Sequence, residues 1–189
     1  MNIILLLLSI SFVVAGGWGL SSLPQYGLPF ERTGSPSVAV IPGLVTRSGP
    51  DLARDGGRFV PKGINYYAKD CSWFCFWDEY ESFLGQIEHE LDLASGLGIN
   101  AIRIFLPYNR FDSTAGNNRN LNNLDHFLGL LKNRGMVAIV TLFDFYPSQA
   151  TSPPYSPQDY ENSKRHIDAV INKIGTANPT VLGWDIKTK

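Results

Sequence analysis

The stretch NAIRIFL, residues 100–106, decides the fold. Its β-branched and aromatic residues predict a strand, and apolar side chains on both faces are typical of a strand within a parallel sheet. A still more apolar strand is predicted at residues 136–143 (MVAIVTLF), and two further strands are predicted at residues 62–66 and 180–186. We therefore expect helices on one face of the sheet and packed side chains on the other.

Helical patterns separate these strands. Phe83, Ile87 and Leu91 recur at helical spacing and predict a helix over residues 78–97, and similar patterns predict helices over 121–133 and 158–174. In the last helix His166 is expected to face solvent, as are the other two histidines. Strands that alternate with helices predict a parallel sheet with right-handed crossovers.

Two architectures have this alternation, the open doubly wound sheet and the (β/α)8 barrel. A nucleotide-binding open sheet should have a glycine-rich turn after its first strand, where this sequence has Asn65-Tyr66-Tyr67 instead. A full barrel needs about 250 residues. We therefore predict an α/β fold that is the N-terminal half, four β/α units, of a (β/α)8 TIM barrel. It spans residues 51–189, begins with a hairpin around Asp55-Gly56, and follows a lead-in over residues 18–50.

The N-terminus carries an uncharged apolar run over residues 3–15. A membrane-spanning helix needs about 20 residues, so the run fits a signal peptide over residues 1–17 better. An uncleaved anchor and a buried strand are the alternatives. The signal-peptide interpretation implies a secreted protein with no stable membrane span after cleavage.

Cys71 and Cys75 are expected to form a local disulfide or to stay as two buried thiols. No other Cys or His lies nearby, so neither a metal site nor any other cofactor is expected. The net charge is −1 and no segment is loaded with Lys and Arg, which argues against a nucleic-acid partner.

The residues at the carboxyl ends of the strands are the candidate site, because barrels build their active sites there. Several are aromatic, and flat rings suit the apolar faces of sugars, although Trp73 and Trp77 fit packing under loops equally well. Arg103 lies inside an apolar strand and needs a partner, either in a structural ion pair or as support for a catalytic carboxylate. The candidate substrate-binding residues are Asn65, Tyr66, Tyr108, Asp144 and Trp184.

Four segments in this order and spacing resemble the N-terminal half of cellulase-type clan A glycoside hydrolases, close to family 5. The similarity covers roughly residues 50–187. The segments are residues 63–67 (GINYY), 97–104 (LGINAIRI), 140–144 (VTLFD) and 181–187 (VLGWDIK).

The resemblance implies a retaining mechanism on a β-linked polysaccharide or oligosaccharide, with two carboxyl groups about 5 Å apart. In that family an Asn-Glu pair at the end of strand four supplies the acid/base, a Glu on strand seven is the nucleophile, and an Arg matching Arg103 supports that nucleophile. Thr188 and Lys189 stand where Asn-Glu belongs, and Lys189 cannot act as a carboxylic acid. Asp185 lies about 10 Å deeper along the strand and is a poor substitute.

We therefore expect a fragment of an exported retaining O-glycosyl hydrolase, cellulase- or mannanase-like, that is inactive alone. The alternative is a non-catalytic carbohydrate-binding half-barrel that must dimerise to close.

Overall fold

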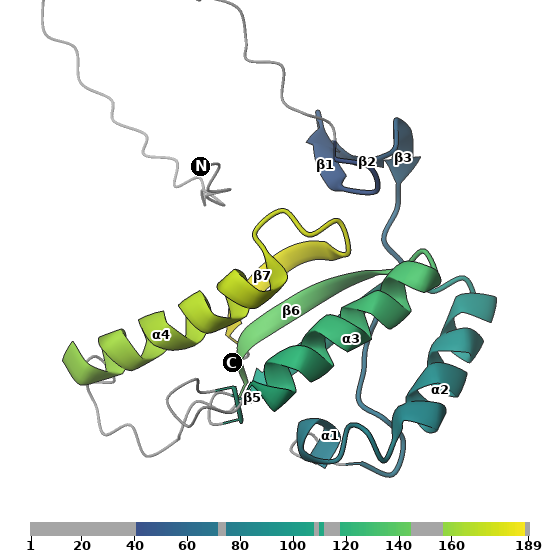
Figure 1. Ribbon diagram of the computed structural model, residues 1–189. Helices are drawn as coiled ribbons and strands as arrows, with labels where there is room; N and C mark the ends of the chain where they lie inside the picture. The colour runs from purple at the N-terminus through teal and green to yellow at the C-terminus, as the bar shows by residue number, and fades with distance from the viewer. Residues whose placement is uncertain (1–40, 72–74, 108–109, 112–117, 145–156, 188–189) are drawn as a thin grey trace, which may run out of the picture. The chain divides into compact units, whose positions relative to one another are not determined.

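The computed structural model describes residues 41–71, 75–107, 110–111, 118–144 and 157–187 (Figure 1). The chain divides into two compact units, Met1–Val38 and Ala39–Lys189. The first unit, which includes the predicted signal peptide and most of the predicted lead-in, lies outside the described residues. The second unit contains two sheets and the helices that pack on one of them.

The first sheet is a small antiparallel one. Asp55 and Gly56 have positive φ angles of 50° and 80° and form its tight turn, so the predicted hairpin is confirmed. An additional strand precedes the hairpin, within the segment predicted to be lead-in. The strands are β1 (Val45–Ser48), β2 (Asp51–Arg54) and β3 (Gly57–Phe59).

The second sheet is parallel and has the strand order β4-β5-β6-β7. Each strand pairs with the next along the chain, and a helix or helices lie between, so the predicted parallel α/β arrangement is confirmed. Asn65 is opposite Arg103 across the first strand pair, and Arg103 is opposite Ile139 across the second. The strands are β4 (Gly63–Asn65), β5 (Ala101–Pro107), β6 (Val137–Asp144) and β7 (Val181–Lys187).

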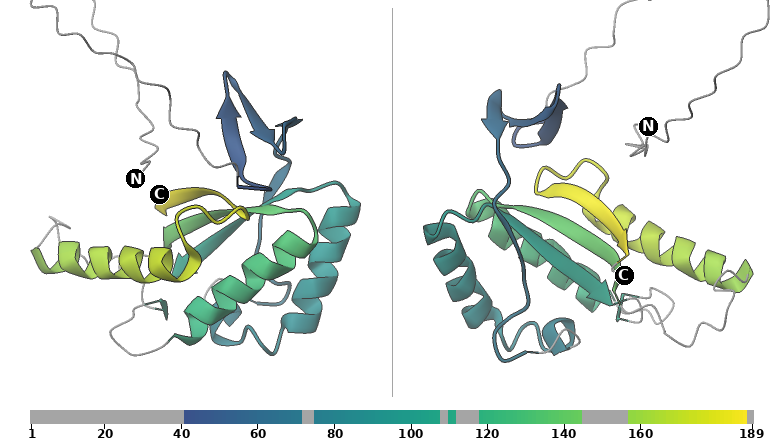
Figure 2. Two further views of the ribbon diagram at one scale, coloured as in Figure 1. Left: turned by 45° about the horizontal axis from the view of Figure 1, so that its top comes forward. Right: turned by 180° about the vertical axis from the view of Figure 1, so that it is seen from behind.

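The helices lie on one side of this sheet (Figure 2). Residues 78–97 do not form the single predicted helix, because a turn at 79–83 separates α1 from α2. The turn allows α1 to bury Trp77 in the core while Ile87 and Leu91 of α2 are buried further along. The helices are α1 (Cys75–Asp78), α2 (Leu84–Gly96), α3 (Arg119–Asn133) and α4 (Pro157–Ile174).

The core lies between the sheet and these helices. Ile102, Ile104 and Leu106 alternate along β5, are fully buried, and belong to the cluster that contains Phe127 and Leu131 of α3. Their alternation means that Arg103 and Phe105 lie on the opposite face of the sheet. That opposite face is where the candidate site is found.

His166 was predicted to face solvent, and that prediction is wrong. Its side chain is 1% exposed, its Nε2 lies 2.7 Å from the carbonyl oxygen of Leu142, and its ring packs beside Phe143. A ring whose polar atom contacts a strand carbonyl can be buried at small cost, so α4 uses a histidine in its core-facing stripe. No helix in the part of the chain that the structure describes is long and apolar enough to cross a membrane.

Candidate functional site

Arg103 lies at the centre of the face that the helices leave uncovered. Its guanidinium forms an ion pair with Asp185 of β7, and its Nε donates to Oγ1 of Thr141 at 3.1 Å. The Thr141 hydroxyl donates in turn to Asp185 Oδ2 at 2.9 Å, which closes a three-residue network across β5, β6 and β7. The Arg103 and Asp185 side chains are 32% and 31% exposed, so the pair borders solvent.

An aromatic pair lies beside this network. Tyr67, just after β4, stacks on Phe105 with ring centroids 5.1 Å apart and planes 16° apart. The Arg103 guanidinium carbon is 4.9 Å from the centroid of the same Phe105 ring. This arrangement places a flat apolar surface next to charged groups at the carboxyl end of the sheet.

Tyr67 also contacts Asp144, the last residue of β6. The Tyr67 hydroxyl donates to Asp144 Oδ2 at 3.3 Å, and Asp144 is 4% exposed. Burial, followed by the negative charge of Asp144, raises the pKa of the Tyr67 hydroxyl above its ordinary value, so the phenol stays protonated and can donate. Asp144, a predicted substrate-binding residue, therefore lies beside the aromatic pair.

Asn65 shares this face because it is in register with Arg103, and its side chain is exposed. A hollow of about 360 Å³ is bordered by Asn65, Arg103 and Ile139, among others. The structure thus brings three of the predicted site residues, Asn65, Arg103 and Asp144, to one face.

Two other predicted residues lie on the helix side instead. Tyr66 is 7% exposed, stacks 5.8 Å from Phe127, and donates its hydroxyl to Glu90 of α2 at 2.9 Å. Trp184 is in register with the fully buried Val140 and packs against the hydrophobic core. Tyr108, the remaining predicted substrate-binding residue, lies outside the described residues, as does Trp73.

Arg103 has the structural ion pair that the sequence analysis considered, and its partner is Asp185. Support for a catalytic nucleophile stays a prediction. Thr141 was not predicted as a member of the site, whereas Tyr67 was expected among the aromatic residues at the strand ends and Asp185 was considered only as a poor substitute for the acid. The sequence does contain a signal for these residues, because side chains at positions i and i+2 of a strand share a face. This signal identifies a site only when the register between the strands is known.

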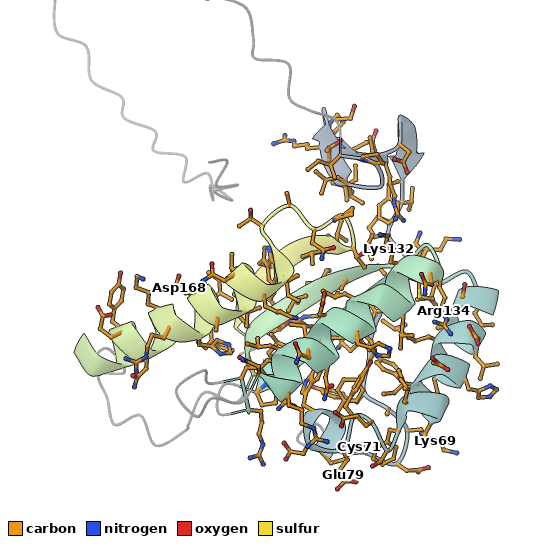
Figure 3. The ribbon with its side chains drawn as sticks, viewed as in Figure 1. Lys69, Cys71, Glu79, Lys132, Arg134 and Asp168 are labelled. Carbon is orange, nitrogen blue, oxygen red and sulfur yellow. A yellow bond between two sulfur atoms is a disulfide. The ribbon has the colours of Figure 1, made fainter. Side chains whose placement is uncertain are left out.

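Helix α1 packs at the carboxyl end of β5. Trp77 is 0% exposed and donates its indole N–H to the carbonyl oxygen of Phe105 at 2.7 Å. Figure 3 shows Cys71 and Glu79 beside this helix. Trp77 is therefore a packing residue, which was the simpler of its two interpretations.

A bigger hollow, of about 580 Å³, lies between α3 and α4, away from the strand ends. Its lining has no aromatic ring and consists mainly of polar side chains that project from the helix surfaces, among them Asn118, Arg165 and Asn172. We assign the site to the sheet face because charged, hydrogen-bonding and aromatic groups converge there. Within the described ranges no three His, Cys, Asp or Glu side chains gather as they would around a metal ion.

Neither a protein-family model nor a curated protein matches the chain, whereas solved structures do. The exo-β-1,4-mannosidase of Opitutaceae bacterium strain TAV5 matches 71% of this chain at 23% identity with a TM-score of 0.61. A glycoside hydrolase family 5 mannosidase from Rhizomucor miehei matches 78% at 18% identity with a TM-score of 0.52. The β-mannanase of the blue mussel Mytilus edulis matches 76% at 16% identity with a TM-score of 0.55.

The matched region therefore has the fold found in family 5 mannosidases and mannanases, and the resemblance seen in the sequence is confirmed at the level of fold. The chain spans 26% of the length of the first of these structures, 49% of the second and 44% of the third.

Proposed function

We propose that this chain supplies strands one to four of an exported (β/α)8 barrel that binds β-1,4-linked mannan oligosaccharides. In the complete barrel it would belong to a retaining O-glycosyl hydrolase. Mannan is placed ahead of cellulose-type glucans because the solved structures that share the fold are named as mannosidases and mannanases.

One observation carries this proposal. The carboxyl end of the sheet combines the stacked rings of Tyr67 and Phe105 with Arg103, Asp144 and Asp185 on a single face. Sugars present apolar C–H faces and many hydroxyl groups, so a ring next to carboxylates and a guanidinium complements both features. The position of this group fits the general placement of barrel active sites.

We further propose that these 189 residues bind glycan without hydrolysing it. Retaining hydrolysis needs an acid and a nucleophile, both carboxyl groups and about 5 Å apart. At the positions where the family resemblance implies Asn-Glu, the sequence has Thr188 and Lys189. In the barrel face that the structure describes, Asp185 is engaged with Arg103 and Thr141 and stands earlier on β7 than the expected acid.

Calorimetric titration with mannohexaose tests the binding, with cellohexaose as the second ligand. Replacing Tyr67 by Ala should weaken binding about two- to tenfold, because one aromatic contact contributes about 0.5–1.5 kcal/mol. Tyr160→Ala is the matched control, since Tyr160 is a 68% exposed tyrosine on α4. Equal losses in the two variants, or no heat with either hexaose, would refute the proposed site, and release of reducing sugar would refute the inactivity.

Export is proposed from the apolar run at residues 3–15 and from the Cys71–Cys75 disulfide, because disulfides persist in oxidising compartments. Fusion of residues 1–17 to a reporter should send it into the culture medium. A reporter retained in the cells would overturn this assignment.

The dimeric, non-catalytic half-barrel remains the second candidate. One observation favours it: β4 and β7 are the outer strands of the described sheet, each with one neighbour, and such edges pair readily with other strands. Sedimentation equilibrium distinguishes the two, since the second candidate requires a dimer. A monomer that unfolds cooperatively would exclude it.

A further inference from the structure

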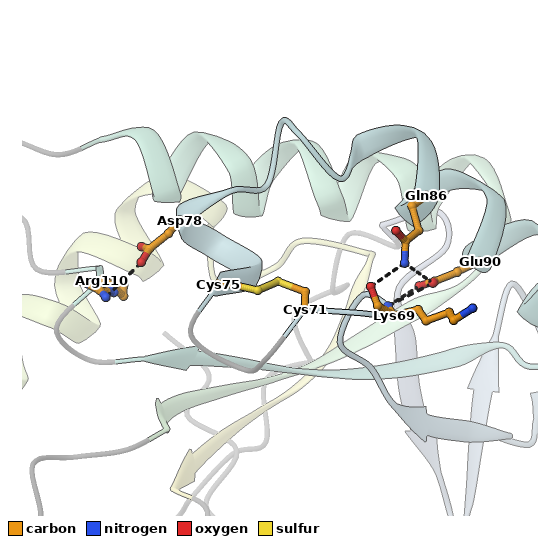
Figure 4. The surroundings of a disulfide bond; sticks show 7 residues. All are labelled: Lys69, Cys71, Cys75, Asp78, Gln86, Glu90 and Arg110. Carbon is orange, nitrogen blue, oxygen red and sulfur yellow. Dashed lines mark hydrogen bonds and ion pairs between the residues drawn. A yellow bond between two sulfur atoms is a disulfide. The ribbon is translucent and has the colours of Figure 1, made fainter.

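A disulfide joins the segment that follows β4 to the first residue of α1 (Figure 4). Cys71 and Cys75 are bonded, with their Cα atoms 5.7 Å apart, which is within the usual range for a bridge. The bridge closes a loop of few residues at the end of the sheet where the candidate site lies. Each of its two sides is also held by contacts other than the sulfur–sulfur bond.

Glu90 of α2 holds the Cys71 side. The backbone N–H of Lys69 donates to both Glu90 carboxylate oxygens, at 3.1 and 3.3 Å, and the Tyr66 hydroxyl donates to one of them at 2.9 Å. Gln86 donates to Glu90 at 2.9 Å and to the Lys69 carbonyl oxygen at 2.6 Å. These bonds fix the chain on both sides of Tyr67, at Tyr66 and at Lys69, and Lys69 lies two residues before Cys71.

The hydrophobic core holds the Cys75 side. Phe76 and Trp77, which follow Cys75 directly, are 1% and 0% exposed, and the Trp77 indole donates to the Phe105 carbonyl oxygen. The backbone N–H of Glu79 donates to the Cys75 carbonyl oxygen at 2.9 Å and completes the helical turn. The position of Cys75 is therefore set by burial of its neighbours.

We propose that Cys71 and Cys75 are a reversible redox site that a dithiol opens and that closes again in place, with Glu90 setting its equilibrium. When the bond is cut, both thiols stay near each other because each side keeps its own anchor. This proximity gives the second thiol a high effective concentration and favours the disulfide relative to an unfolded chain. The Glu90 contacts stabilise the disulfide. By linkage, the disulfide stabilises the Glu90 contacts by the same factor.

The reaction is a thiol–disulfide exchange with a dithiol as reductant. A thiolate of the dithiol attacks Sγ of Cys75, which is less buried than Cys71, and the bond between the two protein sulfurs breaks. Cys71 leaves as a thiolate and takes a proton from water. The second thiolate of the dithiol then attacks the mixed disulfide, closes a disulfide within the reagent and releases Cys75, so two electrons pass from the dithiol to the protein.

The test is a redox titration of the whole chain in buffers of graded reduced and oxidised dithiothreitol. Free thiols are trapped with a maleimide and counted by mass spectrometry. The equilibrium constant for the disulfide should be more than about tenfold larger in native buffer than in concentrated urea. Glu90→Gln should lower the native value about three- to tenfold, since at least one charged hydrogen bond is weakened.

Glu161→Gln is the matched control, because Glu161 is an exposed glutamate on α4. It should leave the constant within about twofold of the original value, as expected for a substitution far from the bridge. Far-ultraviolet circular dichroism should be the same in the reduced and oxidised chain. Equal constants in the Glu90 and Glu161 variants, equal constants in buffer and urea, or loss of the helical signal on reduction would each overturn the proposal.

A second readout connects the bridge with the site and rests on the proposed function. Glu90 fixes the chain around Tyr67, and by linkage reduction of the disulfide weakens those Glu90 contacts, so the reduced chain should bind mannohexaose several-fold more weakly than the oxidised chain. Equal affinity in the two states would remove the coupling to the site. An oxidised chain that binds no glycan would refute the proposed function, while the redox titration would still decide the inference.

Discussion

The Arg103–Asp185 ion pair is expected to stabilise the folded chain more than the ion pairs on the helix surfaces do. Its two side chains are 32% and 31% exposed, so they are partly shielded from water. Coupling energies are about 0.2–1 kcal/mol for exposed pairs, and loss of one partner of a fully buried pair costs about 3–5 kcal/mol. This pair lies between those limits, so we expect a coupling energy of about 1–2 kcal/mol.

A double-mutant cycle measures this quantity. The variants are Arg103→Met, Asp185→Asn and the combination, and the free energy of unfolding of each is obtained from urea denaturation. Asp185→Asn alone should cost about 2 kcal/mol, because Arg103 keeps its bond to Thr141 but loses its counter-charge. The double variant should cost less than the sum of the two single variants.

Lys164 and Asp168 provide the control cycle. This pair lies on one face of α4 at spacing i,i+4, and its side chains are 56% and 51% exposed. Its coupling should be smaller than that of Arg103 and Asp185 and should fall further in high salt. If the coupling between Arg103 and Asp185 is no larger than that of the helix pair, the partly shielded network does not stabilise the sheet as we argue.

Two further predictions concern stability. Trp77→Phe should lower the unfolding free energy by about 1–3 kcal/mol in urea denaturation, because the carbonyl oxygen of Phe105 loses its donor in the core; an unchanged midpoint would show that the indole hydrogen bond is dispensable. The hydrogen bond from Arg119 lowers the pKa of Glu81 from 4.5 to about 2, so this pair stabilises the fold above pH 4.5 and loses its effect as the pH falls toward 2. Both side chains are about half exposed, so the original chain should be more stable than Glu81→Gln by less than about 1 kcal/mol. This difference in unfolding free energy should shrink as the pH falls over that range, and a constant difference would contradict the prediction.

The sequence was sufficient to predict the parallel sheet because β5 and β6 are runs of apolar residues. Such strands are stable only where both of their faces are buried, as they are inside a parallel sheet. Their order with the helices between them then determined the topology. The helix over residues 78–97 was predicted as one piece because Phe83, Ile87 and Leu91 keep helical spacing. The spacing of apolar residues does not reveal the turn at 79–83. That turn forms because Trp77 is buried beneath the end of β5.

The site was harder to predict because it depends on which face each side chain takes. Adjacent residues of a strand point to opposite faces, so an error of one position exchanges a site residue for a core residue. Trp184 and Asp185 show this exchange: an irregularity in the pairing of β6 and β7 after Ala138 sets Trp184 opposite Val140 and Asp185 opposite Thr141. No pattern in the sequence locates such an irregularity.

Tyr66 and Tyr67 make the same point in a form that can be measured. Tyr66 donates its hydroxyl to Glu90 on the helix side, whereas Tyr67 donates to Asp144 beside the stacked Phe105 ring. Tyr66→Phe should therefore cost about 1–2 kcal/mol of stability with little effect on glycan affinity, because a charged acceptor loses a donor in a part-buried position. Tyr67→Phe should differ by weakening glycan binding, since its ring remains but its hydroxyl no longer orients the Asp144 carboxylate toward a sugar. Urea denaturation and mannohexaose titration of the two variants separate these effects, and a reversed pattern would mean that the tyrosine on the sheet face is the structural one.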